Sequence, residues 1–266
     1  MNVARLRQHF KIWLRIAAMS LSAQLSYGLG SFGFLLGKLI RLFFFFAYLL
    51  AIFRHTDRVA GYSLHEIALF FLTFNLIDIV AMVLFRGVYA ARRVVEEGDF
   101  DYHLIQPCSP LFRMAASNVD FLDLATLAPV LALLAWAGPA VPGGLDPWRI
   151  GLYALLLANG IAIALALHVF VAGVAVRTQE LENTIWIYRD LMFLGKFPVD
   201  VYAWPLRWAL TFLVPIGVMV SFPAKGLLGT LSPAWTAYAL TLASLLMAAS
   251  VWFWKKSIAA YTSVSS

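Results

Sequence analysis

Charged residues are scarce in this chain. Only 13% of its 266 residues are charged, whereas 62% are hydrophobic, and the mean hydropathy is +0.81. An ordinary soluble domain is about 25% charged and about 45–50% apolar, so this chain has too little charge to cover the surface of a water-soluble globule. The shortage excludes a soluble enzyme, a disordered chain and a fibrous repeat. It leaves an integral membrane protein.

Cysteines and nucleotide-binding motifs are also lacking. Cys108 is the only cysteine, so the chain can form no internal disulfide and no thiolate metal centre. Gly28–Gly33 matches G-x-G-x-x-G, but an expected membrane span follows where a dinucleotide-binding fold needs a βαβ unit. Gly37-Lys38 lacks the first glycine and the hydroxyl ligand of a phosphate loop. We therefore expect no catalytic, cofactor-binding or metal-binding residue, and no enzyme.

The apolar residues occur in long unbroken runs, which predicts α-helical spans rather than the alternating strands of a β-barrel. Spans of about 20 residues leave no room for a separate soluble domain, so we expect a single transmembrane domain over residues 1–266. Ser109 and Ser232, each followed by proline, predict the starts of two spans, and Pro215 predicts a kink. The six expected spans are 32–53, 66–88, 110–137, 149–176, 206–222 and 234–254.

The N-terminal segment, residues 1–27, predicts an amphipathic helix lying at the membrane surface. Its apolar residues fall on one helical face and its basic residues on the other. Of the 20 Lys and Arg residues, fourteen fall on the side of the N-terminus and four on the other side, while Lys38 and Arg41 lie within the first span. Because basic residues collect on the cytoplasmic side, both termini are expected there. The predicted fold is an all-α, polytopic membrane protein with six spans.

Several ionisable residues lie inside the expected spans: Lys38, Arg41, Asp78, Asp120, Asp123 and His168. A charge at mid-bilayer costs at least about 2.5–3.5 kcal/mol, so these side chains should face protein or water. They could form a proton relay or polar path, or Lys38 or Arg41 could pair internally with Asp78 or Asp120. Internal pairing is favoured, because a proton-driven pump typically uses broken helices at repeat-related positions. Here Pro215 is the only clear interruption.

Clustered charge appears between the second and third spans. Arg92 with Glu96 and Arg93 with Glu97 are spaced as i,i+4 ion pairs on a helix. Gly98 can then close that helix in a left-handed cap, and a short turn of alternating acidic and apolar residues follows. A protein that only conducts would not need such an element. The segment predicts the docking of a cytosolic partner.

Two patches carry a family resemblance. Gly98–Asp101, followed by Leu104 and Pro107, resembles the signature of ABC transporter permeases of the ABC-2 (export) type. More narrowly, the chain is similar to the six-span family called "ABC-2 family transporter protein". Val214-Pro215, followed by the segment 222–229, resembles the end of the fifth span in that family.

The resemblance implies the permease subunit of an exporter in the cytoplasmic (inner) membrane of a prokaryote. Such permeases work with two copies of a separate cytoplasmic ABC ATPase, which carries ATP and Mg²⁺, and with a second permease, identical or sister. No cofactor is then expected on this chain. The resemblance places the ATPase contacts in two loops, at these positions: Arg92, Arg93, Glu96, Glu97, Gly98, Asp99, Phe100, Asp101, Leu104, Pro107, Glu180, Glu182, Trp186 and Arg189.

A substrate route is expected between two permeases rather than inside one. Phe43, Phe46, Asp78 and Pro215 are candidates to line it, because they combine aromatic walls with a polar point and a bend. The alternative is that the aromatic residues face lipid. The net charge of +6 is interpreted as topological, with membrane lipid as a partner and no nucleic acid. A stand-alone secondary transporter or channel remains an alternative function, and an integral-membrane enzyme a weaker one.

Overall fold

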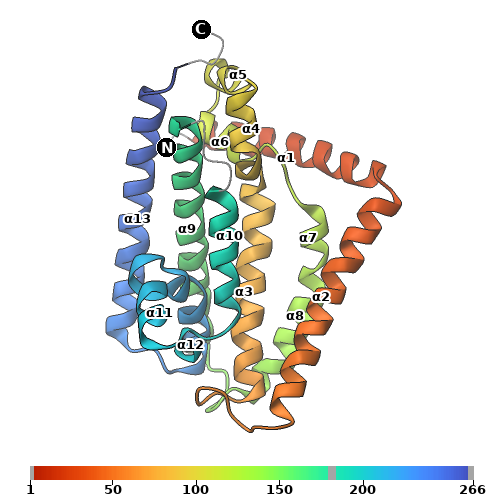
Figure 1. Cartoon of the computed structure of the whole chain (residues 1–266), viewed down its shortest axis with the longest axis vertical. Coiled ribbons are helices and arrows are strands. Elements are labelled where there is room, and N and C mark those ends of the chain that lie inside the picture. Colours follow the sequence, from red (N-terminus) through yellow and green to blue (C-terminus); the bar gives the residue numbers. More distant parts are fainter. Residues whose placement is uncertain (1–2, 179–183, 263–266) are drawn as a thin grey trace.

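The computed structural model describes residues 3–178 and 184–262, and these residues form an all-helical bundle. The long helices α3 (Leu64–Phe85), α9 (Pro147–Thr178) and α13 (Pro233–Ala259) lie side by side, while α2 (Leu29–Phe53) leans away from them (Figure 1). The end of the bundle that carries α5 is called the α5 end below, and the opposite end the α12 end. The start of α1 and the end of α13 both lie toward the α5 end (Figure 1).

Most of the expected spans match observed helices closely. Among the described residues, five helical stretches are long and apolar enough to cross a membrane, and one bent pair of helices adds a sixth candidate. The predicted cap at Ser232 is present, where its hydroxyl accepts a hydrogen bond from the Trp235 N–H at 3.5 Å. A cap that the sequence reading missed starts α3, where Ser63 and Glu66 form a capping box. Serine residues with N-cap character therefore start helices where the local sequence favours it.

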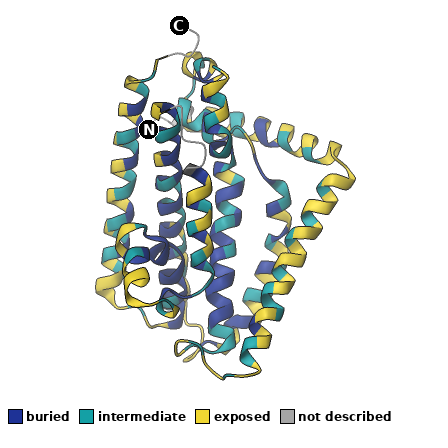
Figure 2. Cartoon of the chain, viewed as in Figure 1, coloured by how far each residue is buried: buried dark blue, intermediate teal, exposed yellow. Residues whose placement is uncertain are grey.

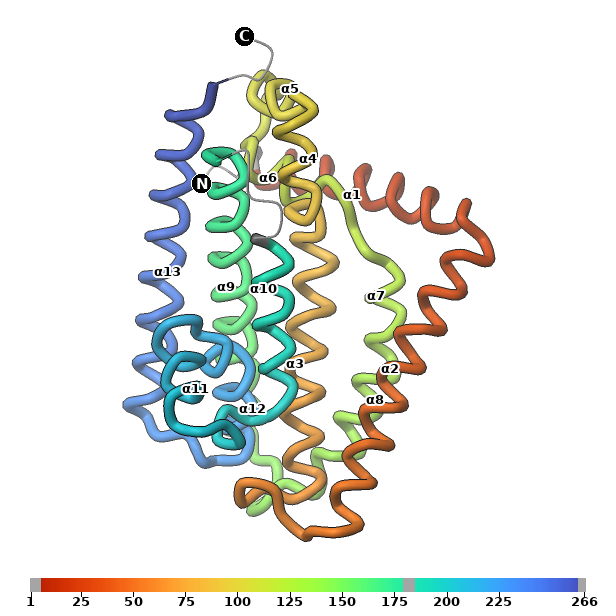
Figure 3. Tube along the Cα trace, in the orientation of Figure 1, coloured from red at the N-terminus to blue at the C-terminus, as the bar shows by residue number. Residues whose placement is uncertain are grey.

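The third span is not one continuous helix, contrary to the prediction over 110–137. It consists of α6 (Pro110–Ala115), a non-helical stretch at 117–120, α7 (Phe121–Ala125) and α8 (Leu127–Ala137) (Figure 3). Ser109 does cap α6, as expected, accepting from the Phe112 N–H at 3.4 Å. Asp120 then caps α7 instead of lying within a helix, because its carboxylate accepts from the Asp123 N–H at 3.1 Å.

Side chains of α1 (Val3–Ser26) satisfy the backbone at this break. Gln24 donates to the Val119 carbonyl at 2.7 Å and accepts from the Phe121 N–H at 3.1 Å. Ser20 accepts from the Val119 N–H at 3.2 Å. Unpaired backbone groups are costly inside a membrane protein, so these contacts explain why the helix can open here. The helix expected near the N-terminus is present, and it runs sideways across the α5 end (Figure 1).

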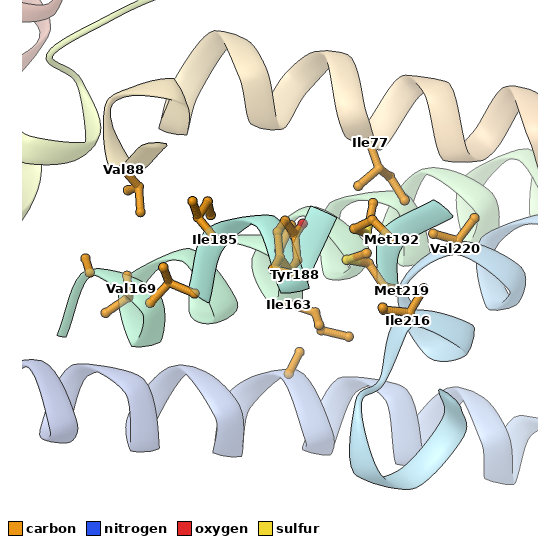
Figure 4. Close-up of a cluster of buried hydrophobic side chains, with 14 of the residues drawn as sticks. Ile77, Val88, Ile163, Val169, Ile185, Tyr188, Met192, Ile216, Met219 and Val220 are labelled. Carbon is orange, nitrogen blue, oxygen red and sulfur yellow. The ribbon is translucent and has the colours of Figure 1, made fainter. Parts of the chain in front are cut away.

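The region expected as the second cytoplasmic loop and fifth span is also organised differently. Helix α10 (Thr184–Phe193) runs back into the bundle between α3 and α9. Its Ile185, Tyr188 and Met192 recur at helical spacing and are buried against α9 and the segment after α11 (Figure 4). The described residues 184–193 are therefore not a surface loop, because they form an amphipathic helix that packs into the core.

The predicted fifth span, 206–222, forms a bent hairpin instead of a single crossing. Helix α11 (Trp204–Trp208) continues in π-helical geometry to Leu213, and a second arm runs over residues 217–228 and includes α12 (Phe222–Leu228). The two arms meet at 85°. Pro215 lies at this break, as expected for a residue that removes a backbone donor, but the bend is much sharper than a kink.

Candidate coupling site and intramembrane ion pairs

Beyond α3, the chain forms a short projection at the α5 end. It consists of α4 (Ala91–Glu96), α5 (Phe100–Ile105) and the turn between them, and is called the α4–α5 projection below (Figure 1). Both expected ion pairs are present, since Arg92 lies 2.7 Å from Glu96 and Arg93 lies 3.8 Å from Glu97. Gly98 has a φ of 78°, in the left-handed region. The turn that follows the helix thus has the geometry that its sequence predicts.

Phe100 fixes the projection to the rest of the bundle. Its side chain is fully buried, and its ring lies 6.2 Å from that of Trp254 and 5.0 Å from that of Tyr261. His103, on the same face of α5, is also buried, and burial together with the charge of Arg113 lowers the pKa of its imidazole. Phe100 was expected to touch a partner, but the structure turns it inward as an anchor on α13.

The opposite face of α5 is open to solvent. Tyr102 is 64% exposed and Ile105 is 79% exposed, and Leu104 is partly exposed beside them. Charged residues and a proline that lie nearby in the sequence are also exposed: Arg93, Glu96, Glu97, Asp99 and Pro107. Ile105 was not selected from the sequence. The signal was available, because positions 100 and 103 share one face of a helix while positions 102 and 105 share another.

Within the described part of the bundle, two basic residues, Lys38 and Arg189, form ion pairs that hold helices together. Lys38 of α2 lies 2.6 Å from Asp123 and 3.3 Å from Asp120, and so ties α2 to α7. Arg189 of α10 lies 3.0 Å from Asp78 of α3. The expected pairing of Lys38 with Asp120 is present. Asp78, however, pairs with Arg189, which the sequence analysis had placed in a cytoplasmic loop.

A family model described as "ABC-2 family transporter protein" matches residues 39–265. The chain belongs to this family. Comparison with curated proteins and with solved structures finds no match. Together with the long apolar helices, the family makes this chain a multi-pass membrane component of an ABC transporter.

The second set of ATPase contacts expected for this ABC-2 family member is spread over different surroundings. Trp186 is exposed on α10, with its ring 6.0 Å from that of Tyr89. Arg189 is engaged with Asp78, so it is not part of an open docking surface. Glu180 and Glu182 lie outside the described residues. The α4–α5 projection is therefore the better-defined surface.

The four residues expected along a substrate route do not line one cavity. Phe43 is exposed on the outer face of α2, whereas the ring of Phe46 lies 5.8 Å from that of Phe71. Asp78 is in its ion pair, and Pro215 is buried at the bend of the hairpin. A route along the outer face of α2 remains a prediction for Phe43, while Pro215 belongs to a different part of the permease.

His168 is packed within the core of the permease. It is fully buried on α9, its Nδ1 lies 2.8 Å from the Ala164 carbonyl oxygen, and its ring lies 4.8 Å from that of Tyr188. These contacts hold the imidazole among aromatic side chains, one of which, Tyr89, also accepts a hydrogen bond from Arg189 at 3.5 Å. The arrangement favours a packing role for this residue.

A third polar cluster was missed by the sequence analysis. Asp200 lies 2.6 Å from Lys225 of α12 and 3.8 Å from Arg207 of α11, and it accepts a hydrogen bond from Tyr62 at 2.9 Å. Burial alone would raise the pKa of Asp200, but the hydrogen bond and charge of Lys225 outweigh it, so the pKa is lowered. The cluster fastens both arms of the hairpin to the loop between α2 and α3.

Proposed function

We propose that this chain is the permease subunit of an ATP-driven exporter and that a separate ABC ATPase docks on the α4–α5 projection. The observation that carries the proposal is the exposed apolar patch at Tyr102 and Ile105, which exposed charged residues flank in the sequence. Apolar patches with a polar rim are typical of protein interfaces. Because Phe100 clamps the same short helix to α13, a movement of the ATPase would be passed directly to the membrane helices.

The proposal includes two ATPase copies, which hold ATP and Mg²⁺, and a second permease, identical or sister. Gly33 and Gly37 of α2 support the second permease, because a Cβ added at either position would meet nothing within 4 Å in this chain. A G-x-x-x-G face lets two membrane helices approach closely. Within the described part of the chain this face has no partner helix, which favours contact with another subunit over internal packing.

Substitution of the exposed patch tests the ATPase contact. We expect Ile105→Asp to reduce the ATPase recovered with the tagged chain at least about tenfold, since central interface residues contribute about 2 kcal/mol or more. Leu145→Asp is the matched control, because it places the same charge at an exposed leucine near the α12 end. Recovery is measured as ATPase-to-permease stoichiometry by quantitative mass spectrometry of the purified membrane complex.

Two results would contradict the assignment. A stoichiometric ATPase bound to the Ile105→Asp variant would show that the contact lies elsewhere. Wild-type chain without any ATPase, together with transport that stops when the proton gradient is dissipated, would show a secondary transporter.

The secondary transporter has one structural feature in its favour. The break at 117–120 adds a second interruption to the one at Pro215, whereas the sequence analysis had found only the latter. Ion sites in such transporters are formed at discontinuous helices, and Lys38, Asp120 and Asp123 lie at this break. The two interruptions differ in form, however, since one is an extended stretch near α1 and the other a hairpin bend.

We further propose that the α5 end is cytoplasmic. Arg207 lies with the α12 end, and Arg189 and Lys196 lie between the ends, so the fourteen-to-four asymmetry becomes eleven to five. The sign of the asymmetry is unchanged. On a Cys108→Ser background, cysteines at Gly143 or Thr230 should react with an impermeant thiol reagent from outside the cell, and a cysteine at Glu97 or Ser265 should not. Outside reactivity at Glu97 would invert the orientation.

A further inference from the structure

Two adjoining cavities lie along the inner side of α2. The cavity nearer the α5 end has a volume of about 440 Å³ and is lined mainly by polar side chains, including Gln24 and Asn118. The other has a volume of about 260 Å³, and Lys38, Arg41 and Asp123 line both. The two cavities together are called the α2 groove below. Volumes of this order can hold a small ligand.

Aromatic side chains dominate the second cavity. Six of them line it: Phe44, Phe45, Tyr48, Phe71, Phe74 and Phe193. The rings of Phe45 and Phe71 are stacked, with their centroids 3.6 Å apart. The α2 groove therefore has a polar part and an apolar part, which meet at Lys38 and Arg41.

The charges of the groove do not balance. Five cations and three carboxylates line it. All three carboxylates are engaged, because Asp120 and Asp123 pair with Lys38, and Asp78 pairs with Arg189. Three cations have no carboxylate within 4.0 Å among the residues that the structure describes: Arg41, Arg86 and Lys196.

Arg41 is the most exceptional of these cations. It lies at the middle of the 25-residue span α2, where an uncompensated charge costs at least about 2.5–3.5 kcal/mol. Lys196 lines the same cavity from the turn after α10, with its ammonium 4.2 Å from the centre of the Phe193 ring. Two cations that face one cavity from different elements repel each other. An anionic group between them would offset both the repulsion and the cost of a charge at mid-bilayer, and an Arg fork suits phosphate or carboxylate oxygens.

We propose that the α2 groove binds an amphiphile with an anionic head group, and that such amphiphiles are the substrate class of this permease. Arg41 and Lys196 bind the head group, and the aromatic cavity takes the start of the apolar tail. The exposed outer face of α2 offers a way in from the membrane. The substrate part rests on the proposed exporter function, whereas the binding site does not.

Binding is tested on the purified chain alone, without an ATPase, by native mass spectrometry from a neutral detergent. Three probes separate the features of the ligand: lysophosphatidylglycerol has an anionic head and a tail, lysophosphatidylcholine has a zwitterionic head and a tail, and glycerol phosphate has the anion without a tail. We expect the first to bind at least tenfold more tightly than the other two. We expect Arg41→Gln with Lys196→Gln to remove that preference.

Arg54→Gln with Arg58→Gln is the matched control, because it removes the same charge from exposed positions at the far end of α2. This control should keep the preference, and Arg41→Lys should keep most of it. Thermal unfolding checks that the variants are folded, and we expect no loss of stability when unpaired cations are removed.

Several outcomes would overturn the proposal. Equal binding of the two lysolipids would show that the groove does not select an anionic head group. Glycerol phosphate binding as tightly as lysophosphatidylglycerol would show a site for free anions without a role for the tail. If Arg41→Gln splits a dimer while lipid preference persists, the second permease supplies the missing carboxylate instead.

The substrate assignment has a separate test in the permease–ATPase complex. We expect lysophosphatidylglycerol to stimulate ATP hydrolysis at least about twofold in wild type and not in the Arg41→Gln, Lys196→Gln variant. Binding without stimulation would refute the substrate assignment and leave a lipid-binding site. Failure of any ATPase to copurify would refute the exporter function and leave the binding result standing.

Discussion

The first two spans are nearly equal in hydropathy and opposite in surroundings. The stretch Leu29–Phe53 has a mean hydropathy of 2.0 in its most apolar window, and only 6% of that window is buried. The stretch Leu64–Glu96 reaches 2.4, and 72% is buried. Figure 2 shows the contrast, with α3 mostly buried and α2 largely exposed. The apolar composition places both helices in the membrane. It does not determine whether a helix packs against the rest of the chain or stays exposed.

The difference in burial indicates that α3 and α2 have different roles. Helix α3 is mostly buried and connects the α4–α5 projection to the core. Helix α2 is largely exposed, and it offers two features to groups from outside the chain. Gly33, Gly37 and Arg41 are four residues apart and lie along one stripe of the helix, and Lys38 and Arg41 line the α2 groove. We therefore expect substitutions in α3 to act on folding and those in α2 to act on assembly and binding.

The largest expected difference comes from truncating one aromatic ring in each helix. Phe70 of α3 is fully buried, so Phe70→Ala should lower the free energy of unfolding by about 3–5 kcal/mol. Phe43 of α2 is exposed, so Phe43→Ala should change it by less than about 0.5 kcal/mol. Thermal unfolding of the purified chain in one detergent measures both. Equal losses would mean that α2 is covered within the purified particle.

A smaller difference is expected from adding one methyl group to a glycine. At Gly87, just after α3, a Cβ would collide with the carbonyl oxygen of Met114 and the hydroxyl of Ser117. Gly87→Ala should therefore cost about 1–3 kcal/mol. Gly37→Ala in α2 meets open space and should be neutral or stabilising by up to about 1 kcal/mol in an isolated subunit.

The same Gly37→Ala variant also tests the proposed contact with a second permease. If the Gly33 and Gly37 face contacts another permease, Gly37→Ala should weaken association, measured by the mass of the particle as protein is diluted in detergent. Unchanged association would remove this face from the subunit contact.

The smallest expected effect concerns the loop that joins the two helices. Asp200 bonds to Tyr62 of this loop and to Lys225, and its side chain is 26% exposed. Asp200→Asn should cost about 1.5 kcal/mol, at the lower end for hydrogen bonds to charged groups because of that exposure. The loss should appear as a lower unfolding temperature, with Asp57→Asn, at an exposed position of the same loop, as control.

The pH dependence of this cluster follows from the lowered pKa of Asp200. A carboxyl with a lowered folded-state pKa contributes stability that is fully present above its unfolded pKa and is lost as pH falls through the folded value. The contribution should be constant between about pH 5 and pH 8 and decline below about pH 4. Asp200→Asn should show a smaller acid loss than wild type. An equal acid loss in both would mean that other carboxylates dominate.

Local signals in the sequence were sufficient for much of the fold. The caps at Ser109 and Ser232, the left-handed Gly98 and the ion pairs of α4 depend on residues within about one helical turn. The anchor at Phe100 was predicted with the opposite role. A six-residue helix buries one face and exposes the other, and only the position of α13 shows which face is covered.

The break in the third span and the path of α10 could not be read from hydropathy. The break needs hydrogen bonds from Gln24, which lies 95 residues from its partner Val119. Helix α10 carries a charge, Arg189, that looks like a loop residue until Asp78, 111 residues away, is seen beside it. Such contacts lower the free energy only when the fold brings both partners together. Neither residue alone therefore indicates the contact in the sequence.

The sequence by itself determined the membrane class, the family, the approximate extent of the long helices α1, α2, α3, α9 and α13, and the geometry of the projection's turn. Each of these rests on composition or on residues close together in the chain. The tertiary structure decided which apolar helix is core and which is open, which charges are paired and which remain to bind a ligand. The physical reason is that burial and electrostatic compensation are properties of the space around a side chain, and that space is built from distant segments.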